Sequence, residues 1–194
     1  HRWRALLGWW YSLEYAGGFL GGDNYCWRPE VHLSRFQPLT NTPIKTLLAL
    51  NLEAGLVSPF DGREVVPLER YYMGGENSIR GFQFRSIYVT DEVTGLPVLQ
   101  DGYFKGGDKF IQMNVELQLL IGGPFRVILF ADGGNVYDDD QSIDISRLRT
   151  SAGGELRIFV PIFGAPLRFI YSSNLDPQPL DRFESFQFSI GATF

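Results

Sequence analysis

The 194-residue sequence predicts an all-β protein, and more specifically an antiparallel transmembrane β-barrel. Polar and apolar residues alternate in stretches of about 10 residues that are separated by turn residues, which is typical of barrel strands. Long and short connections alternate along the chain, and aromatic residues gather toward the ends of the stretches. The mean hydropathy of -0.07 agrees with a barrel, because polar lumen-facing residues offset the apolar lipid-facing ones.

The composition excludes several functional classes. The net charge of -5 argues against nucleic acid as a partner, because a phosphate-binding surface needs an excess of basic residues. Cys26 is the only cysteine, so neither an internal disulfide nor a cysteine-based zinc site can form. His1 and His32 lie far apart without ligand partners at metal spacing, so we assign no metal and no cofactor. No serine, histidine and acid arrangement suggests nucleophilic catalysis, and we do not expect an enzyme.

The sequence predicts one domain over residues 1–194 and no membrane-spanning helix. The chain length suits a single domain, and no apolar run approaches the roughly 20 residues that a membrane helix needs. Residues 1–16 lack the basic, apolar and cleavage regions of a signal peptide and have the pattern of a strand interior. We therefore expect this chain to be part of a longer protein.

About eight alternating runs are predicted as strands, bounded by turn residues at 40–43, 122–124 and 163–166 among others. In chain order they span residues 3–16, 25–37, 44–57, 108–121, 125–136, 147–160, 166–174 and 184–194. The long connections fall on alternate turns and therefore on one side of the sheet; they are 58–107, 137–146 and 175–183. A soluble β-sandwich would share the alternation, but this asymmetry is typical of outer-membrane barrels with long extracellular loops.

The two-faced pattern is clearest in three runs. In 44–57, Leu48, Leu50, Leu52 and Leu56 oppose Asn51, Glu53 and Gly55. In 109–120, Ile111, Met113, Val115, Leu117 and Leu119 oppose Gln112, Asn114, Glu116 and Gln118. In the last run, Phe186, Phe188, Ile190, Ala192 and Phe194 oppose Ser185, Gln187, Ser189, Gly191 and Thr193. One face of each run suits lipid and the other suits water.

Aromatic residues near the predicted strand ends indicate interfacial girdles, where one end of the ring is apolar and the other wet. These residues are Trp3, Trp9, Trp10, Tyr11, Tyr15, Tyr25 and Trp27. The alternative interpretation is an ordinary aromatic core.

The connection 58–107 is far longer than a hairpin needs, and loops of this length without structure of their own are usually functional or disordered. Its aromatic content argues against disorder. Residues 70–82 read Arg-Tyr-Tyr-Met-Gly-Gly-Glu-Asn-Ser-Ile-Arg-Gly-Phe. A glycine-rich phosphate loop is a competing interpretation, but no lysine follows the glycines and no helical pattern opens there.

This segment resembles the sixth-loop signature of the outer-membrane assembly and translocation superfamily that includes BamA, TamA and the two-partner-secretion transporters. The matching residues are Gly74, Gly75, Ser78, Ile79, Arg80, Gly81 and Phe82. The resemblance continues in register through 130–136, which is similar to the family's F-x-D-x-G-x-V strand, and through 151–154. It ends in the terminal strand 186–194. Together these segments cover about 74–194, so the resemblance extends over more than half of the chain.

The resemblance implies that these strands form the second half of an approximately sixteen-stranded barrel, without the periplasmic POTRA modules. It also implies that the loop folds into the barrel and that Arg80 pairs with Asp132 and with Glu116 on the inner wall. Gly81 would permit a tight backbone turn, and Phe82 would pack against the wall. Without the resemblance, a solvated Arg80 would be the favoured interpretation.

Glu155, Arg157 and Arg168 also alternate onto polar faces. They could line the lumen, but the sequence by itself favours solvated strand charges for them.

The resemblance implies an integral outer-membrane protein that inserts other barrel proteins, with unfolded outer-membrane proteins, membrane lipids and accessory assembly proteins as partners. The terminal strand would form a weak seam with the first strand, through Phe186, Phe188, Ile190, Gly191 and Phe194, and Gly191 would weaken its pairing locally. Two alternatives stay open: a pore that secretes one dedicated partner, and a barrel that anchors a fused enzyme such as a patatin-like lipase.

Overall fold

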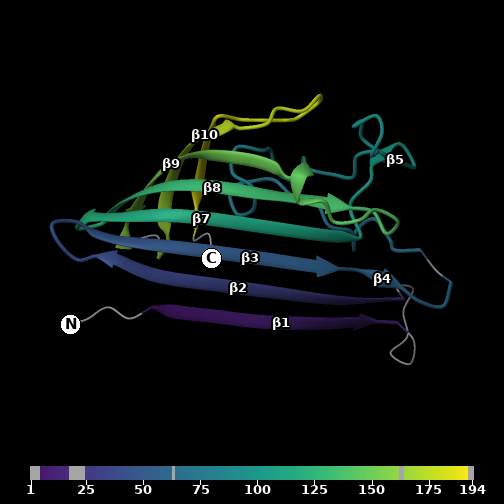
Figure 1. The fold of residues 1–194 in the computed structure, drawn as a ribbon, viewed down its shortest axis with the longest axis horizontal. Helices are drawn as coiled ribbons and strands as arrows, with labels where there is room; N and C mark the ends of the chain where they lie inside the picture. The colour runs from purple at the N-terminus through teal and green to yellow at the C-terminus, as the bar shows by residue number, and fades with distance from the viewer. Residues whose placement is uncertain (1–4, 18–24, 63, 162–163, 192–194) are drawn as a thin grey trace.

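The computed structural model describes residues 5–17, 25–62, 64–161 and 164–191. In these residues nine strands form one antiparallel sheet in the order β1-β2-β3-β7-β8-β9-β10-β11, with β4 beside β2 (Figure 1). The long strands are β1 Leu6–Ala16, β2 Cys26–Thr40, β3 Lys45–Leu56, β7 Lys109–Gly122, β8 Phe125–Tyr137, β9 Arg149–Phe159, β10 Pro166–Asn174 and β11 Phe186–Ile190. The short elements are β4 Ser58–Pro59, a separate ribbon of β5 Leu99–Gln100 and β6 Tyr103–Phe104, and a 3-10 turn at Ile145–Arg147. No helix in the described ranges is long and apolar enough to cross a membrane.

The antiparallel all-β class and the eight predicted strands are confirmed, and their ends differ by a few residues. Strand β2 runs on to Thr40, because a bulge after Pro38 lets Thr40 pair with Thr46. Strand β11 is shorter than expected and ends at Ile190. Gly191 therefore lies in the bend after the strand, with a φ of 152°, and its N–H donates to the Pro166 carbonyl. Residues 3, 4, 163 and 192–194 of the predicted segments, with Trp3 and Phe194 among them, lie outside the described residues.

Polar residues face the inside of the curved sheet and apolar residues face outward. On β7, Asn114 and Glu116 are buried, whereas Met113 and Val115 are 37% and 42% exposed. Register extends this arrangement across neighbouring strands, since Asn51, Asn114 and Asp132 lie side by side in one row. This inverted distribution is that of a sheet whose outer face meets lipid.

The aromatic residues of β1 and β2 do not form a core, so that alternative is wrong for those that the structure describes. Trp9 and Tyr11 stack on each other and are 67% and 71% exposed on the outer face. Trp10 points to the opposite face and stacks on His32. Tyr15 and Trp27 are also exposed, whereas Tyr25 is half-buried with its ring edge against Phe60.

The long connections gather at one end of the strands, on the right in Figure 1, as the sequence predicts. The connection between β4 and β7 is ordered by its own contacts and by contacts with its neighbours. For example, the Gln141 side chain donates to the Thr90 carbonyl. An apolar cluster lies between this loop and the inner face of β8, and it consists of Met73, Ile79, Phe82, Ile87, Val89 and Val136. The loop thus occupies the concave side of the sheet.

Candidate functional site

Glycines shape the loop motif into a closed turn against the inner wall. The Gly75 N–H donates to the Phe82 carbonyl at 2.9 Å, and the Ser78 N–H donates to the Gly75 carbonyl at 3.1 Å. Gly74, Gly75 and Gly81 have φ values of 102°, 104° and 90°, which glycine adopts without strain. At Gly81 a β-carbon would also lie only 2.4 Å from the Phe183 ring. This turn carries Arg80 into the sheet.

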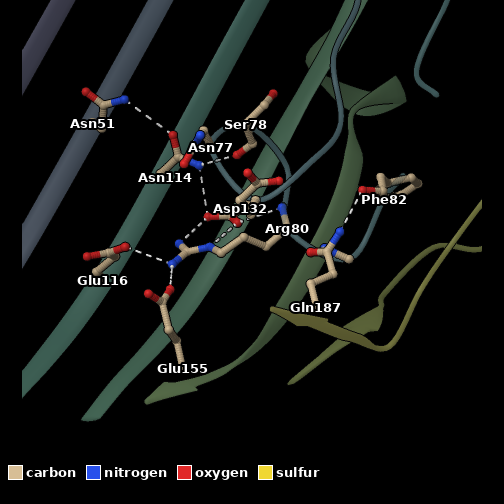
Figure 2. Close-up of polar contacts among 12 residues, drawn as sticks. Asn51, Asn77, Ser78, Arg80, Phe82, Asn114, Glu116, Asp132, Glu155 and Gln187 are labelled. Atoms are coloured by element: carbon tan, nitrogen blue, oxygen red, sulfur yellow. Dashed lines mark hydrogen bonds and ion pairs between the residues drawn. The ribbon is translucent and has the colours of Figure 1, made fainter. Parts of the chain in front are cut away.

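Arg80 is fully buried and contacts three carboxylates from three adjacent strands (Figure 2). Its Nε and Nη2 donate to the two oxygens of Asp132 on β8, each at 2.7 Å. Its Nη1 donates to Glu116 on β7 at 2.8 Å and to Glu155 on β9 at 2.9 Å. The guanidinium also lies 3.7 Å from the centre of the Phe130 ring. Glu116 and Asp132 are the two partners that the resemblance implies, and Glu155 is an additional one.

Two more arginines balance the charge of this cluster. Arg157 donates from Nη2 to Glu116 at 2.9 Å and from Nε to Glu155. Arg168 on β10 donates from Nε to Glu155 at 2.7 Å. Glu155, Arg157 and Arg168 are all buried, so the expectation of solvated strand charges is wrong for them. Three cations and three anions share the site, and this pairing is what makes burial of the charges tolerable.

The loop backbone is bound as well as the arginine side chain. Asn114 on β7 donates from its amide nitrogen to both the Ser78 carbonyl and Asp132, each at 2.9 Å. Ser78 donates its hydroxyl proton to Gln112 at 2.9 Å. Arg168 donates to the side chain of Asn77 and to the carbonyl of Glu76. The inner wall therefore recognises the loop in one defined position.

On the other side of the turn, the loop contacts the last strand. The Gly81 N–H donates to Oε1 of Gln187 on β11 at 2.7 Å, and the Gln187 amide nitrogen donates to the Phe82 carbonyl at 3.1 Å (Figure 2). The Phe82 ring meets the Phe183 ring edge to face.

The structure brings the predicted motif residues together but keeps the predicted seam residues apart from them. Ile79 and Phe82 are buried in the loop's apolar cluster. Phe186, Phe188 and Ile190 are 60%, 52% and 55% exposed on the outer face of β11.

Sequence reasoning missed Glu155 as a partner of Arg80, and it missed Gln187. Alternation placed both residues on inner faces, which was the one available signal.

The side chains of this site hold the loop through hydrogen bonds and ion pairs. Among the residues that the structure describes, no group of three or more His, Cys, Asp or Glu side chains is placed to hold a metal ion. The three carboxylates at the centre are occupied by arginines.

Comparisons with known proteins show what this chain is similar to. The model of the Omp85 superfamily domain matches residues 10–194. The outer membrane protein assembly factor BamA of Neisseria meningitidis serogroup B is 28% identical over an alignment of 193 residues. The match covers 82% of this chain and 23% of that protein. BamA of Nitratidesulfovibrio vulgaris is 30% identical over an alignment of 189 residues, and this match covers 93% of this chain and 22% of that protein. The chain thus spans about a quarter of the length of these relatives.

The fold matches a solved barrel too. The crystal structure of BamA from Haemophilus ducreyi lacking POTRA domains 1-3 superposes with a TM-score of 0.70 and 22% identity, over 95% of this chain and 41% of that one. Because the family model covers nearly the whole chain and the fold agrees, this chain belongs to the Omp85 superfamily of integral outer-membrane β-barrel proteins.

Proposed function

We propose that this chain is the carboxy-terminal part of the barrel domain of an outer-membrane protein assembly factor. Its substrates are unfolded outer-membrane proteins, and its surroundings are outer-membrane lipids and accessory assembly proteins. The observation that carries the proposal is the burial of Arg80 among Asp132, Glu116 and Glu155, in a chain similar to assembly factors. The protein works without covalent catalysis, metal or nucleotide.

In this proposal Arg80 locks the extracellular loop 58–107 inside the barrel. A planar guanidinium suits the task, because it stays charged and can satisfy several carboxylate oxygens at fixed angles. The loop then fixes the relative positions of β7, β8 and β9, each of which supplies one carboxylate. Removing one member of such a buried set commonly costs about 3–5 kcal/mol, because the remaining charges stay buried without a partner.

The terminal strand provides the seam at which substrate strands are assembled. Strand β11 pairs with β10, and within the described residues no strand pairs with its other edge. Unpaired backbone groups along an edge can template an incoming strand. The apolar outer face of Phe186, Phe188 and Ile190 would keep this edge at lipid depth. Within the described residues, the regular pairing of β11 stops at Ile190, just before the bend at Gly191.

Reconstitution of the full-length protein into liposomes tests the function. Wild type should accelerate the folding of an unfolded outer-membrane protein, and Arg80→Ala should remove most of that acceleration. Arg85→Ala is the matched control, because Arg85 lies in the same loop, is exposed and contacts the Tyr72 ring rather than a carboxylate.

Two outcomes would contradict the proposal. An active Arg80→Ala protein would contradict the lock. Conductance across the bilayer without any acceleration of folding would instead favour a secretion pore.

A further inference from the structure

One side chain, Gln187, connects the loop motif to the last strand. It accepts a hydrogen bond from the Gly81 N–H and donates one to the Phe82 carbonyl, at 2.7 and 3.1 Å. A glutamine amide has one acceptor and one donor end, and here each end meets the backbone of a different loop residue. The hydrogen bonds of Gln187 therefore depend on the position of the loop backbone and not on which side chains the loop carries.

The Arg80 cluster and Gln187 hold opposite sides of the same short turn. Arg80 is bound by β7, β8 and β9, and the next two residues, Gly81 and Phe82, are bound by β11. The turn is stiff, because the Phe82 carbonyl also accepts from the Gly75 N–H and the space beside the Gly81 α-carbon is filled. A shift of Arg80 would consequently move the two groups that Gln187 binds.

Strand β11 has few other attachments. It is five residues long and pairs with β10 between Leu167 and Tyr171. Among the described residues, two backbone hydrogen bonds flank this pairing: the Gly191 N–H donates to the Pro166 carbonyl, and the Ser172 N–H donates to the Ser185 carbonyl. Its outer face is exposed, so inward contacts must supply the rest of its positioning. Of its two inward residues, Ser189 makes only a 3.3 Å contact with the Glu76 side chain, whereas Gln187 makes two hydrogen bonds to backbone.

The segment before β11 follows the same loop. The Glu184 N–H donates to the Gly81 carbonyl at 2.6 Å, and the Gln83 N–H donates to the Arg182 carbonyl at 2.9 Å. These contacts align the approach to the strand, but they lie outside its pairing with β10. Within the strand itself, Gln187 makes both hydrogen bonds to the loop backbone, and Ser189 adds the longer contact with the Glu76 side chain.

We propose that Gln187 is the positioning residue through which the locked loop sets the place of the terminal strand. Release of the turn at residues 80–82 frees β11, and loss of Gln187 frees β11 while the Arg80 cluster stays intact. The inference rests on the proposed function only in taking β11 as the strand that moves during assembly.

Amide hydrogen exchange of the full-length protein in lipid vesicles tests this coupling. Gln187→Ala should speed exchange in β11 by on the order of tenfold, as expected for the loss of two partly buried hydrogen bonds. Exchange in β7, β8 and β9 should stay at the wild-type rate. Arg80→Ala should speed exchange in both the loop and β11. The double variant should show no further increase in β11, because both changes break the same connection.

Gln37→Ala is the matched control. Gln37 is a strand glutamine on β2, and its side-chain hydrogen bonds among the described residues are with Arg35 and with the Pro38 carbonyl rather than with the loop. It should leave β11 unchanged. The proposal would be overturned if β11 exchanged at the wild-type rate in Gln187→Ala. It would also be overturned if the increases in the exchange rate caused by Arg80→Ala and by Gln187→Ala multiplied in the double variant.

The folding assay on the same proteins separates this inference from the proposed function. A wild-type protein that fails to accelerate substrate folding would contradict the assembly function and leave the exchange result standing. Acceleration by wild type together with uncoupled exchange would contradict the role of Gln187 alone.

Discussion

Arg80 and Asp132, 52 positions apart in sequence, are joined by three hydrogen bonds to a single carboxylate. The Nε and Nη2 atoms donate at 2.7 Å each, and the backbone N–H of Arg80 donates to the same group at 3.1 Å. Side chain and backbone are thus fixed together. Asp132 specifies both the guanidinium plane and the path of the loop, which a point charge could not do.

Arg80→Lys should therefore fail to replace arginine. An ammonium keeps the positive charge but cannot occupy both oxygens of Asp132 and also reach Glu116 and Glu155. We expect destabilisation of the loop by about 3–5 kcal/mol, close to that of alanine. Limited proteolysis of the loop in lipid vesicles measures this, with Arg85→Lys as the control. Wild-type protease resistance of Arg80→Lys would show that charge alone holds the loop.

Gly81→Ala should detach the turn. A β-carbon would lie 2.4 Å from the Phe183 ring and from Ser172 Oγ, and φ would stay near 90°. We expect a loss of about 3 kcal/mol or more, since backbone strain and a clash combine. Gly95→Ala separates the two effects, because Gly95 has a φ of 68° and open space around it. It should cost only about 1 kcal/mol. Equal protease sensitivity of both variants would contradict the clash.

Glu155→Gln should unbalance the buried cluster. Glu155 contacts Arg80, Arg157 and Arg168, so its neutralisation leaves three cations facing two anions. Urea unfolding should report a loss of about 3–5 kcal/mol. Adding Arg168→Met restores the balance, so the double variant should lose less than the sum of the two single losses. Additive losses would show that the six charges do not act as one set.

Asp108 and Asp138 lie just outside the strands, and this pair of carboxyl groups should make the stability of the loop depend on pH. Burial raises the pKa of Asp108 to about 6, although Arg70 opposes this. Burial also acts to raise the pKa of Asp138, but its hydrogen bonds, first of all that from Lys105, hold that pKa below its usual value.

A raised folded-state pKa contributes stability that is fully present below about pH 4 and is lost as the pH rises through 6. The loop should thus be held more firmly at pH 5 than at pH 7. Hydrogen exchange of residues 104–108 at the two pH values, corrected for intrinsic exchange, measures the difference. Asp108→Asn should abolish it, and an unchanged pH dependence in that variant would assign the titration to another group.

The sequence by itself determined the strands, their faces and the end at which the loops gather. Alternation has a period of two residues, so it assigns each side chain to the inner or outer face wherever a strand is regular, as Glu116, Glu155 and Gln187 illustrate. The motif around Arg80 identified the loop and, through family resemblance, two of its carboxylates.

Only the tertiary structure decided which inward residues meet. Contact depends on height along the strand, and height is set by the register between strands, which alternation does not contain. Register puts Arg157 and Arg168 in one row, beside the row of Glu155 and Gln187. The long loop then brings Arg80 into contact with Glu155. Charges that look solvated along a single strand thereby become one buried cluster, because neighbouring strands supply the partners that water would otherwise provide.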